Sequence, residues 1–137
     1  MYSVNWNYPT LIRFGCGRLS ELDECCQSLG MKNPLLVTDP GLAALPMVQY
    51  LLKEHPHFGL FKDVRPNPVG ANVSAGVEAY RAGEHDGVVA MGGGSALDVG
   101  KAVALMVGQD RPLWDFEDVG DNFKRVKEAG MAPVVAV

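Results

Sequence analysis

Continuous apolar runs alternate along the chain with stretches in which apolar and polar residues recur at helical spacing. The runs predict strands at residues 11–14, 35–38, 58–64, 87–91 and 133–137. The intervening stretches predict helices at residues 19–29, 42–53, 73–82 and 96–107, with an interruption at Pro46. Strands that are apolar throughout, rather than alternating, are typical of a parallel sheet covered on both faces. The pattern therefore predicts an α/β fold: a doubly wound, mostly parallel, Rossmann-like sheet with helices on both faces.

Composition and charge exclude several classes of protein. With 137 residues, 47% hydrophobic and 20% charged, the chain fits one globular domain rather than a disordered segment. A net charge of −4 gives no overall basic field for nucleic acid or anionic lipid, and no apolar run is long enough to span a membrane. The first residues of the chain lack a signal-peptide pattern. The odd number of cysteines, Cys16, Cys25 and Cys26, is typical of a chain whose thiols are reduced. We expect a cytoplasmic protein that binds neither nucleic acid nor membrane.

The last predicted strand bears on domain organisation. The sequence stops at Val137, inside an apolar run. Parallel strands normally lead to a loop and a further helix. We therefore expect residues 1–137 to be one domain of a longer protein.

A run of glycines carries the most informative candidate chemistry. Gly92, Gly93, Gly94 and Ser95 follow an apolar strand and precede a helix. Glycines let the chain turn sharply and let a ligand approach amides that a Cβ atom would shield. The free N–H groups at a helix start, together with the positive end of its dipole, favour a phosphate or pyrophosphate. These four residues are therefore candidates for cofactor binding.

Two residues of the following helix admit more than one interpretation. Ser95 is placed to cap the helix, and Asp98 stands where a capping-box carboxylate would return to the Ser95 amide. Asp98 is therefore either a cofactor-site residue or a structural one that caps the helix and pairs with Lys101. The glycine run is alternatively a tight turn without a ligand. An ATP-binding P-loop is disfavoured, because Ser95 replaces its first glycine and Ala102 replaces its magnesium-binding hydroxyl.

A second glycine pattern occurs near the start of the chain. Residues 15–20 resemble G-x-G-x-x-G with Ser20 in place of the third glycine, and Asp39 follows at roughly the spacing of an acidic ribose ligand. Since Arg13 weakens the preceding strand, we interpret residues 15–20 as a turn. Asp39 is a candidate in either case, because a carboxylate there can accept from a ribose hydroxyl and would repel the 2′-phosphate of NADP. It also fits a helix N-cap before Pro40.

The histidines do not form an evident metal site in the sequence. His55 and His57 flank Pro56 in a predicted surface loop, and no acidic residue or cysteine completes a ligand set at a convincing spacing. No arrangement of nucleophile and base is visible. The acidic segment 115–121 is predicted to be a solvated loop. We expect no catalytic residue and no metal ligand in this chain.

Several segments together carry a resemblance to a known family. Residues 92–101, GGGSALDVGK, resemble the G-G-G-S-x-x-D-x-x-K motif of iron-containing (group III) alcohol dehydrogenases. Residues 6–17 are similar to that family's first hairpin, residues 36–39 to its adenosine-side strand, and residues 64–68 to its P-N-P turn. The resemblance covers essentially the whole chain.

The resemblance implies a cofactor and a reaction. Gly93, Gly94 and Ser95 would bind the pyrophosphate of NAD, Asp39 the adenine ribose, and Asn67 would lie beside the cofactor. The family transfers a hydride reversibly between an alcohol and NAD(P), giving an aldehyde or ketone, while Fe2+ or another divalent metal polarises the substrate oxygen. Its metal ligands lie in a C-terminal helical domain that residues 1–137 lack. The chain would thus be the dinucleotide-binding domain, inactive alone, of an enzyme expected to form a homodimer.

Two alternatives stay open at this point. The chain could act alone as a nucleotide-binding or dimerising module, because the sequence offers no catalytic metal ligand. It could also derive from a glycerol dehydrogenase or dehydroquinate synthase relative, which shares the architecture. Ser95 after the glycine run favours the alcohol dehydrogenase branch. NAD is favoured over NADP because of Asp39.

Overall fold

The computed structural model describes residues 10–137, so predictions for residues 1–9, including the start of the opening hairpin, lie outside the described residues. Helices and strands alternate from α1 to β4. The regular elements are α1 (Leu22–Ser28), β1 (Leu35–Val37), α2 (Pro40–Ala43), α3 (Pro46–Glu54), β2 (Gly59–Phe61), α4 (Gly70–Ala82), β3 (Val88–Ala90), α5 (Gly94–Met106) and β4 (Val134–Ala136). Short 3-10 turns lie at Arg18–Glu21, Leu113–Phe116, Asn122–Arg125 and Glu128–Gly130.

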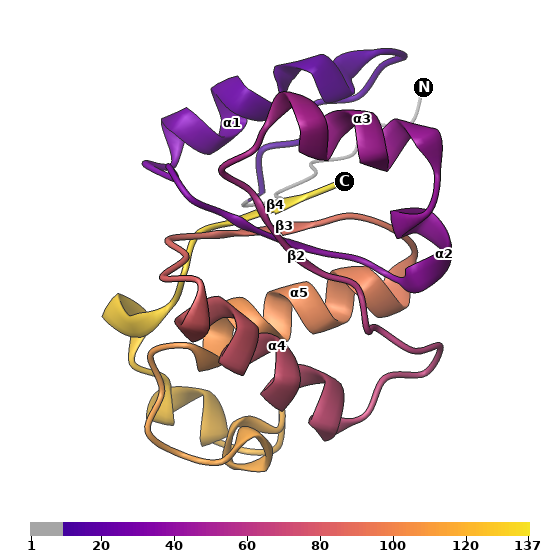
Figure 1. Cartoon of the computed structure of the whole chain (residues 1–137). Coiled ribbons are helices and arrows are strands. Elements are labelled where there is room, and N and C mark those ends of the chain that lie inside the picture. Colours follow the sequence, from indigo (N-terminus) through magenta and orange to yellow (C-terminus); the bar gives the residue numbers. More distant parts are fainter. Residues whose placement is uncertain (1–9) are drawn as a thin grey trace, which may run out of the picture.

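The strands form one parallel sheet of four strands in the order β2-β1-β3-β4. From β1 the chain crosses to β2 on one side, returns past β1 to β3 on the other, and continues outward to β4 (Figure 1). The direction of winding therefore reverses between β1 and β3. This is the doubly wound topology that the sequence predicts.

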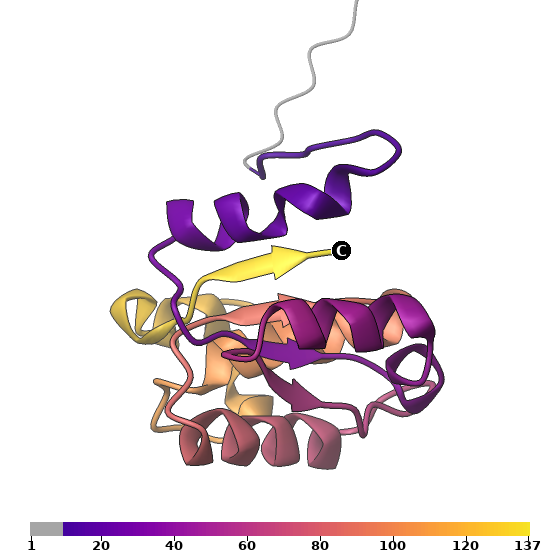
Figure 2. The same ribbon diagram turned by 45° about the horizontal axis from the view of Figure 1, so that its top comes forward.

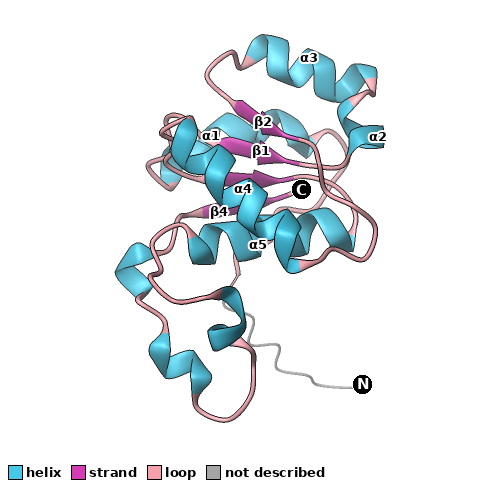
Figure 3. Cartoon of the chain, turned by 60° about the horizontal axis from the view of Figure 1, so that its bottom comes forward, coloured by secondary structure: helices cyan, strands magenta, loops and turns pink. Residues whose placement is uncertain are grey.

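Helices cover both faces of the sheet, with α1 and α3 on one side and α4 and α5 on the other (Figures 1 and 3). Side chains alternate between the two layers. Leu35, Val37 and Val88 pack in the cluster with α4 and α5. Leu36 and Val89 pack in the cluster with α1 and α3. Every residue of β1 and β3 is buried, because both neighbours and both faces are occupied.

Several predicted boundaries change in the structure. Residues 11–14 form no strand, although three of the four are apolar, and Phe14 is 94% exposed. Pro46 does not merely interrupt a helix but begins α3, since a first-turn proline loses no helical hydrogen bond. The helix predicted at 73–82 begins at Gly70, and the acidic segment lies in turns and loops as expected. Within residues 10–137, no helix combines the length and apolar character that crossing a bilayer requires.

One buried polar atom is left without a partner. Thr38, directly after β1, is fully buried, and its hydroxyl oxygen makes no hydrogen bond within the described residues. The Thr38 amide, in contrast, donates to the carbonyl of Phe61 at 2.9 Å. An unsatisfied buried hydroxyl costs about 1–3 kcal/mol of desolvation that its packing must offset.

We expect Thr38→Val to leave the free energy of unfolding unchanged or raise it by about 1 kcal/mol, because a methyl group replaces the unpartnered hydroxyl at nearly constant volume. Urea denaturation measures the change. Asn72→Leu is the matched control, since the Asn72 amide is hydrogen-bonded at both ends and its loss should destabilise. Destabilisation by Thr38→Val of more than about 1 kcal/mol would show that the hydroxyl has a partner.

Candidate functional site

The predicted cofactor residues meet where the sheet reverses its winding. Asp39 follows the carboxyl end of β1, and Gly92 follows that of the adjacent β3. The Oδ2 atom of Asp39 lies 3.6 Å from where a Cβ atom on Gly92 would stand. In open α/β sheets, ligands bind outside the carboxyl ends of the strands at this kind of reversal. The structure thus brings together an acidic side chain and a glycine run that are far apart in the sequence.

The backbone of the glycine run is held at one end and open at the other. Gly92 has φ 142°, a value that L side chains rarely adopt, and its amide donates to the Val137 carbonyl at 3.0 Å. In contrast, a Cβ atom added to Gly93 or Gly94 would meet no atom of the described residues within 4 Å. Both glycines therefore present backbone to open space rather than to protein. This is the geometry that close approach of a ligand to the chain requires.

Helix α5 begins at Gly94, two residues earlier than predicted. Its N-cap is Gly93, no side chain caps it, and the Ala96 and Leu97 amides donate to the Gly93 carbonyl. The amides of Gly94 and Ser95 donate to no acceptor in the described part of the chain. A helix of 13 residues thus points its uncapped positive end at the open space beside Asp39.

The predicted capping box at Ser95 and Asp98 is wrong. Ser95 lies within the first turn, because the extended backbone of Gly93 starts the helix earlier. Asp98 is exposed and pairs with Lys101 at 3.5 Å, so its carboxylate does not return to the Ser95 amide. The ion pair is the structural role that the sequence left open for Asp98. Since neither side chain blocks the helix start, the first amides stay available.

Asp39 fulfils its structural role and keeps one oxygen free. Its Oδ1 accepts from the Leu42 amide at 2.9 Å and caps α2, whose first residue is Pro40. No hydrogen bond joins Oδ2 to another atom of residues 10–137. The carboxylate is half-buried beside the glycine run. One side chain can therefore cap a helix and accept a hydrogen bond from a ligand.

Asn67 lies on the loop after β2, at the same edge of the sheet. It is exposed and has φ 51°, in the left-handed region that asparagine tolerates. Sequence analysis missed the residue that anchors this loop, which is Asn72. Its side chain accepts from the Val69 amide at 3.1 Å and donates to the Asp63 carbonyl at 3.0 Å. A local signal existed, because an amide at the third position of a helix commonly reaches back to the N-cap.

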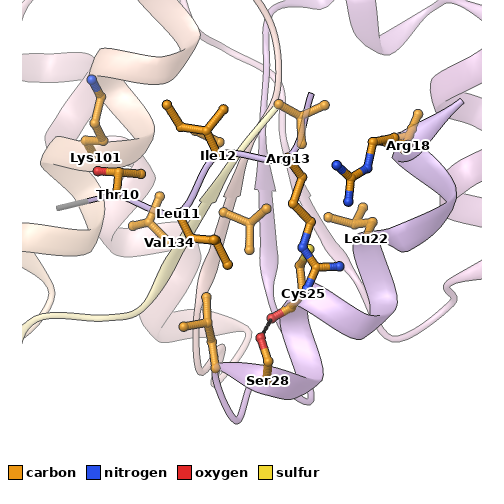
Figure 4. Close-up of a pocket in the computed structure, with 15 residues that line it drawn as sticks. Thr10, Leu11, Ile12, Arg13, Arg18, Leu22, Cys25, Ser28, Lys101 and Val134 are labelled. Atoms are coloured by element: carbon orange, nitrogen blue, oxygen red, sulfur yellow. Dashed lines mark hydrogen bonds between the residues drawn. The ribbon is translucent and has the colours of Figure 1, made fainter. Parts of the chain in front are cut away.

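Two cavities lie near these elements. One of about 410 Å³ is bordered by Pro40, Phe61 and Asn72, and lies at the carboxyl end of β2. The other, of about 660 Å³, lies between the segment 10–13, helix α1 and strand β4, with Lys101 at its rim (Figure 4). Figure 2 shows β4 passing beneath α1 at this edge of the sheet. The lining of this larger cavity is mostly aliphatic, which suits packing better than phosphate binding.

The second glycine pattern is a turn, as interpreted from the sequence. The described residues that precede it, 10–14, form no strand, and the Ser20 hydroxyl donates to the Gly17 carbonyl at 3.0 Å. Its charged residues are already paired: Glu21 accepts from Arg18 at 2.6 Å and from Arg13 at 2.9 Å. These two guanidinium groups, Arg18 first, lower the pKa of Glu21 to about 2. The arginines therefore tie the turn to α1 and are engaged with a carboxylate rather than free for a phosphate.

Comparison with known proteins places the chain in a family. The family described as iron-containing alcohol dehydrogenase matches residues 9–137. The chain belongs to this family. It is 36% identical over 129 residues to alcohol dehydrogenase 4 of Saccharomyces cerevisiae, covering 90% of this chain and 34% of that protein. The family assignment and the fold that the sequence predicts are thereby confirmed.

Solved structures of relatives agree with the fold. Sulfoacetaldehyde reductase from Bifidobacterium kashiwanohense, in complex with NAD+, matches 98% of this chain and 36% of its own, with a TM-score of 0.81 and 31% identity. An NADH-dependent butanol dehydrogenase from Thermotoga maritima matches 98% of this chain and 34% of its own, with a TM-score of 0.78 and 25% identity. The chain thus spans about a third of the length of these relatives.

The Glu21 ion pairs should contribute stability that depends on pH. The pKa of Glu21 is lowered from 4.5 to about 2, so its contribution is complete above pH 4.5 and is lost as pH falls toward 2. We expect Glu21→Gln to lower the melting temperature at neutral pH, and the difference from wild type to shrink below pH 4.5. Thermal melts followed by circular dichroism test this. Glu78→Gln, on the exposed surface of α4, should show no such dependence.

Proposed function

We propose that residues 1–137 form the dinucleotide-binding domain of an NAD-dependent alcohol dehydrogenase that also requires a divalent metal. The observation that carries the proposal is the uncapped start of α5, whose amides face open space beside the Asp39 carboxylate. Membership of the iron-containing alcohol dehydrogenase family supports the reaction class. The reaction would be reversible hydride transfer between a small alcohol and NAD, giving an aldehyde or ketone.

The residues at the sheet edge fit the parts of NAD. The amides of Gly93, Gly94 and Ser95 would donate to the pyrophosphate, which the helix dipole also attracts. Gly92 contributes the sharp turn that exposes them. The free Oδ2 of Asp39 would accept from the adenosine ribose.

Two further residues have weaker support. Asn67 would lie beside the cofactor on the loop after β2, at the same edge of the sheet. Asp98 stands one turn inside α5 and is engaged with Lys101, so a contact with the cofactor would require that ion pair to open. We assign Asp98 only an indirect influence on the charge near the helix start.

This domain would supply binding and orientation rather than the whole reaction. When bound, the oxidised cofactor would accept the hydride from an alcohol, the reduced cofactor would donate it to an aldehyde or ketone, and the divalent metal would polarise the substrate oxygen. We propose that residues 1–137 bind NAD without turning over alcohols. Exposure of Leu11, Ile12 and Phe14 supports association of copies, most simply as a homodimer. A cytoplasmic location stays a prediction.

Calorimetric titration with NAD, run beside a turnover assay with Fe2+ and short alcohols, tests this proposal. We expect saturable binding and no alcohol oxidation by residues 1–137 alone. A crystal soaked with NAD should place the pyrophosphate at the start of α5. NAD bound at another place, or no binding, would contradict the assignment of the domain. Alcohol oxidation by this chain would contradict the separation of cofactor binding from the metal.

We expect Gly94→Val to weaken NAD binding at least about tenfold, because the valine side chain would fill the space through which the pyrophosphate approaches the amides. Loss of one charge-assisted hydrogen bond costs about 1.5 kcal/mol or more. The fold should survive, because a side chain at Gly94 meets open space. Gly70→Val is the matched control: Gly70 is also the first residue of a 13-residue helix, so it reports the cost of valine at such a position. Affinity within about twofold of wild type would place the phosphate site elsewhere.

Asp39 should set the preference between NAD and NADP. We expect Asp39→Asn to raise the NADP-to-NAD affinity ratio about tenfold, because it removes a negative charge near the 2′-phosphate. The amide oxygen can still cap α2, so stability should change little. Asp39→Gly should raise the ratio similarly and lose the side-chain cap, but it should lower stability by only about a few tenths of a kcal/mol, because glycine is itself a tolerated N-cap. An unchanged ratio in both variants would leave Asp39 as a helix cap only.

A further inference from the structure

Three metal-ligating side chains converge at a place that the proposed function does not use. His55 and His57 lie in the turn between α3 and β2, and Asp23 lies on α1. One ligand atom from each lies within 4.8 Å of the other two, and the His55 Nδ1 and Asp23 Oδ1 atoms are 3.0 Å apart. The carboxylate that the sequence spacing did not offer thus comes from a distant helix.

Both imidazole rings pack against Phe58. The ring of Phe58 lies 5.1 Å from that of His55 and 4.9 Å from that of His57, measured between centroids. Phe58 is buried in the same cluster as Leu22 and Cys26, the neighbours of Asp23 on α1. The core that holds α1 against the sheet therefore also holds the carboxylate beside the imidazoles. Such support from packed elements is what a preorganised metal site needs.

The donor set and spacing suit a particular class of cation. Two imidazole nitrogens and one carboxylate oxygen are ligands that Zn2+ takes at about 2.0–2.2 Å, with water in a fourth position. Ligand atoms of such a tetrahedral site lie roughly 3.3 Å apart, close to the observed separation of His55 and Asp23. The exposed side chain of His57 can turn to close the remaining distance. Mg2+ and Ca2+, which prefer oxygen ligands, fit less well.

We propose that Asp23, His55 and His57 form a binding site for Zn2+ or a related borderline divalent cation. The site joins α1 to the turn before β2. That turn enters β2 at its amino end, whereas the glycine run follows the carboxyl end of β3 in the same parallel sheet. A cation here is therefore remote from the proposed NAD site and acts on the fold. Binding to the folded state alone raises its stability.

Metal titration of the 137-residue chain, prepared without a polyhistidine tag, tests the proposal. We expect one Zn2+ per chain by calorimetry, visible d–d absorption when Co2+ replaces it, and a higher melting temperature with either ion. Asp23→Asn and His57→Gln should each weaken Zn2+ binding by about tenfold or more. Glu54→Gln is the matched control, since it removes an exposed negative charge next to His55 but no ligand. Salt screens such a charge, so the Zn2+ affinity of this variant should stay within about twofold of wild type.

Several outcomes would overturn the proposal: no saturable Zn2+ binding by the wild-type chain, unchanged affinity in both ligand variants, or an equal loss in Glu54→Gln. Since His57 is exposed, His57→Gln should keep the fold, and its circular dichroism spectrum verifies this. NAD titration of the same variant keeps the two proposals distinguishable. Normal NAD affinity with impaired Zn2+ binding is the result expected if the sites are separate.

Discussion

The adjacent strands β1 and β3 impose the constraint on which the rest of the structure depends. Both are buried on each face and along each edge, so two layers of helices must cover them. The crossover through α3 covers one face, and those through α4 and α5 cover the other (Figure 1). Because the chain leaves β1 and β3 in opposite directions, no crossover passes over their carboxyl ends. The open edge at Asp39 and the glycine run therefore follows from the topology.

Close packing of α5 on β3 then fixes the start of that helix. A Cβ atom on Gly100 would overlap the Cβ atom of Ala90, so only a glycine lets the helix approach the strand this closely. The amides at the start of α5 thus face a fixed point beyond the sheet. Leaving them without a cap costs stability locally, and the burial of Val99 and Val103 on the same helix offsets it. Natural proteins accept such local costs mainly at functional sites.

Sequence pattern was sufficient for the elements that bury continuous apolar runs, whereas only the family resemblance linked Asp39 to the glycine run at residues 92–95. It failed where the outcome depends on distant residues or on backbone angles. Leu11 is apolar yet 82% exposed, because a strand also needs a neighbour to pair with, and within residues 10–137 the segment 10–14 pairs with no strand of the sheet. Ser95 was predicted to be the N-cap of α5 because serine is common at that position. In the structure the N-cap is Gly93, whose backbone is extended. The pairing of Asp23 with His55 depends on how α1 packs, which a single sequence does not encode locally.

The two proposed sites lie at opposite ends of the sheet and would bind their ligands through different groups. Substitutions should therefore affect one site without affecting the other. At the carboxyl end the proposed donors are backbone amides, so most side-chain substitutions would leave them in place unless they fill the space at Gly93 or Gly94. The proposed charge selection there depends on the Asp39 carboxylate, because the Leu42 amide holds one of its oxygens and the other makes no hydrogen bond within residues 10–137. At the amino end the proposed ligands are side chains, and both imidazole rings pack against the buried Phe58, so the core influences their geometry. Changes in packing between α1 and α3 should therefore alter the Asp23–His55 pair while leaving the start of α5, on the opposite face, unaffected.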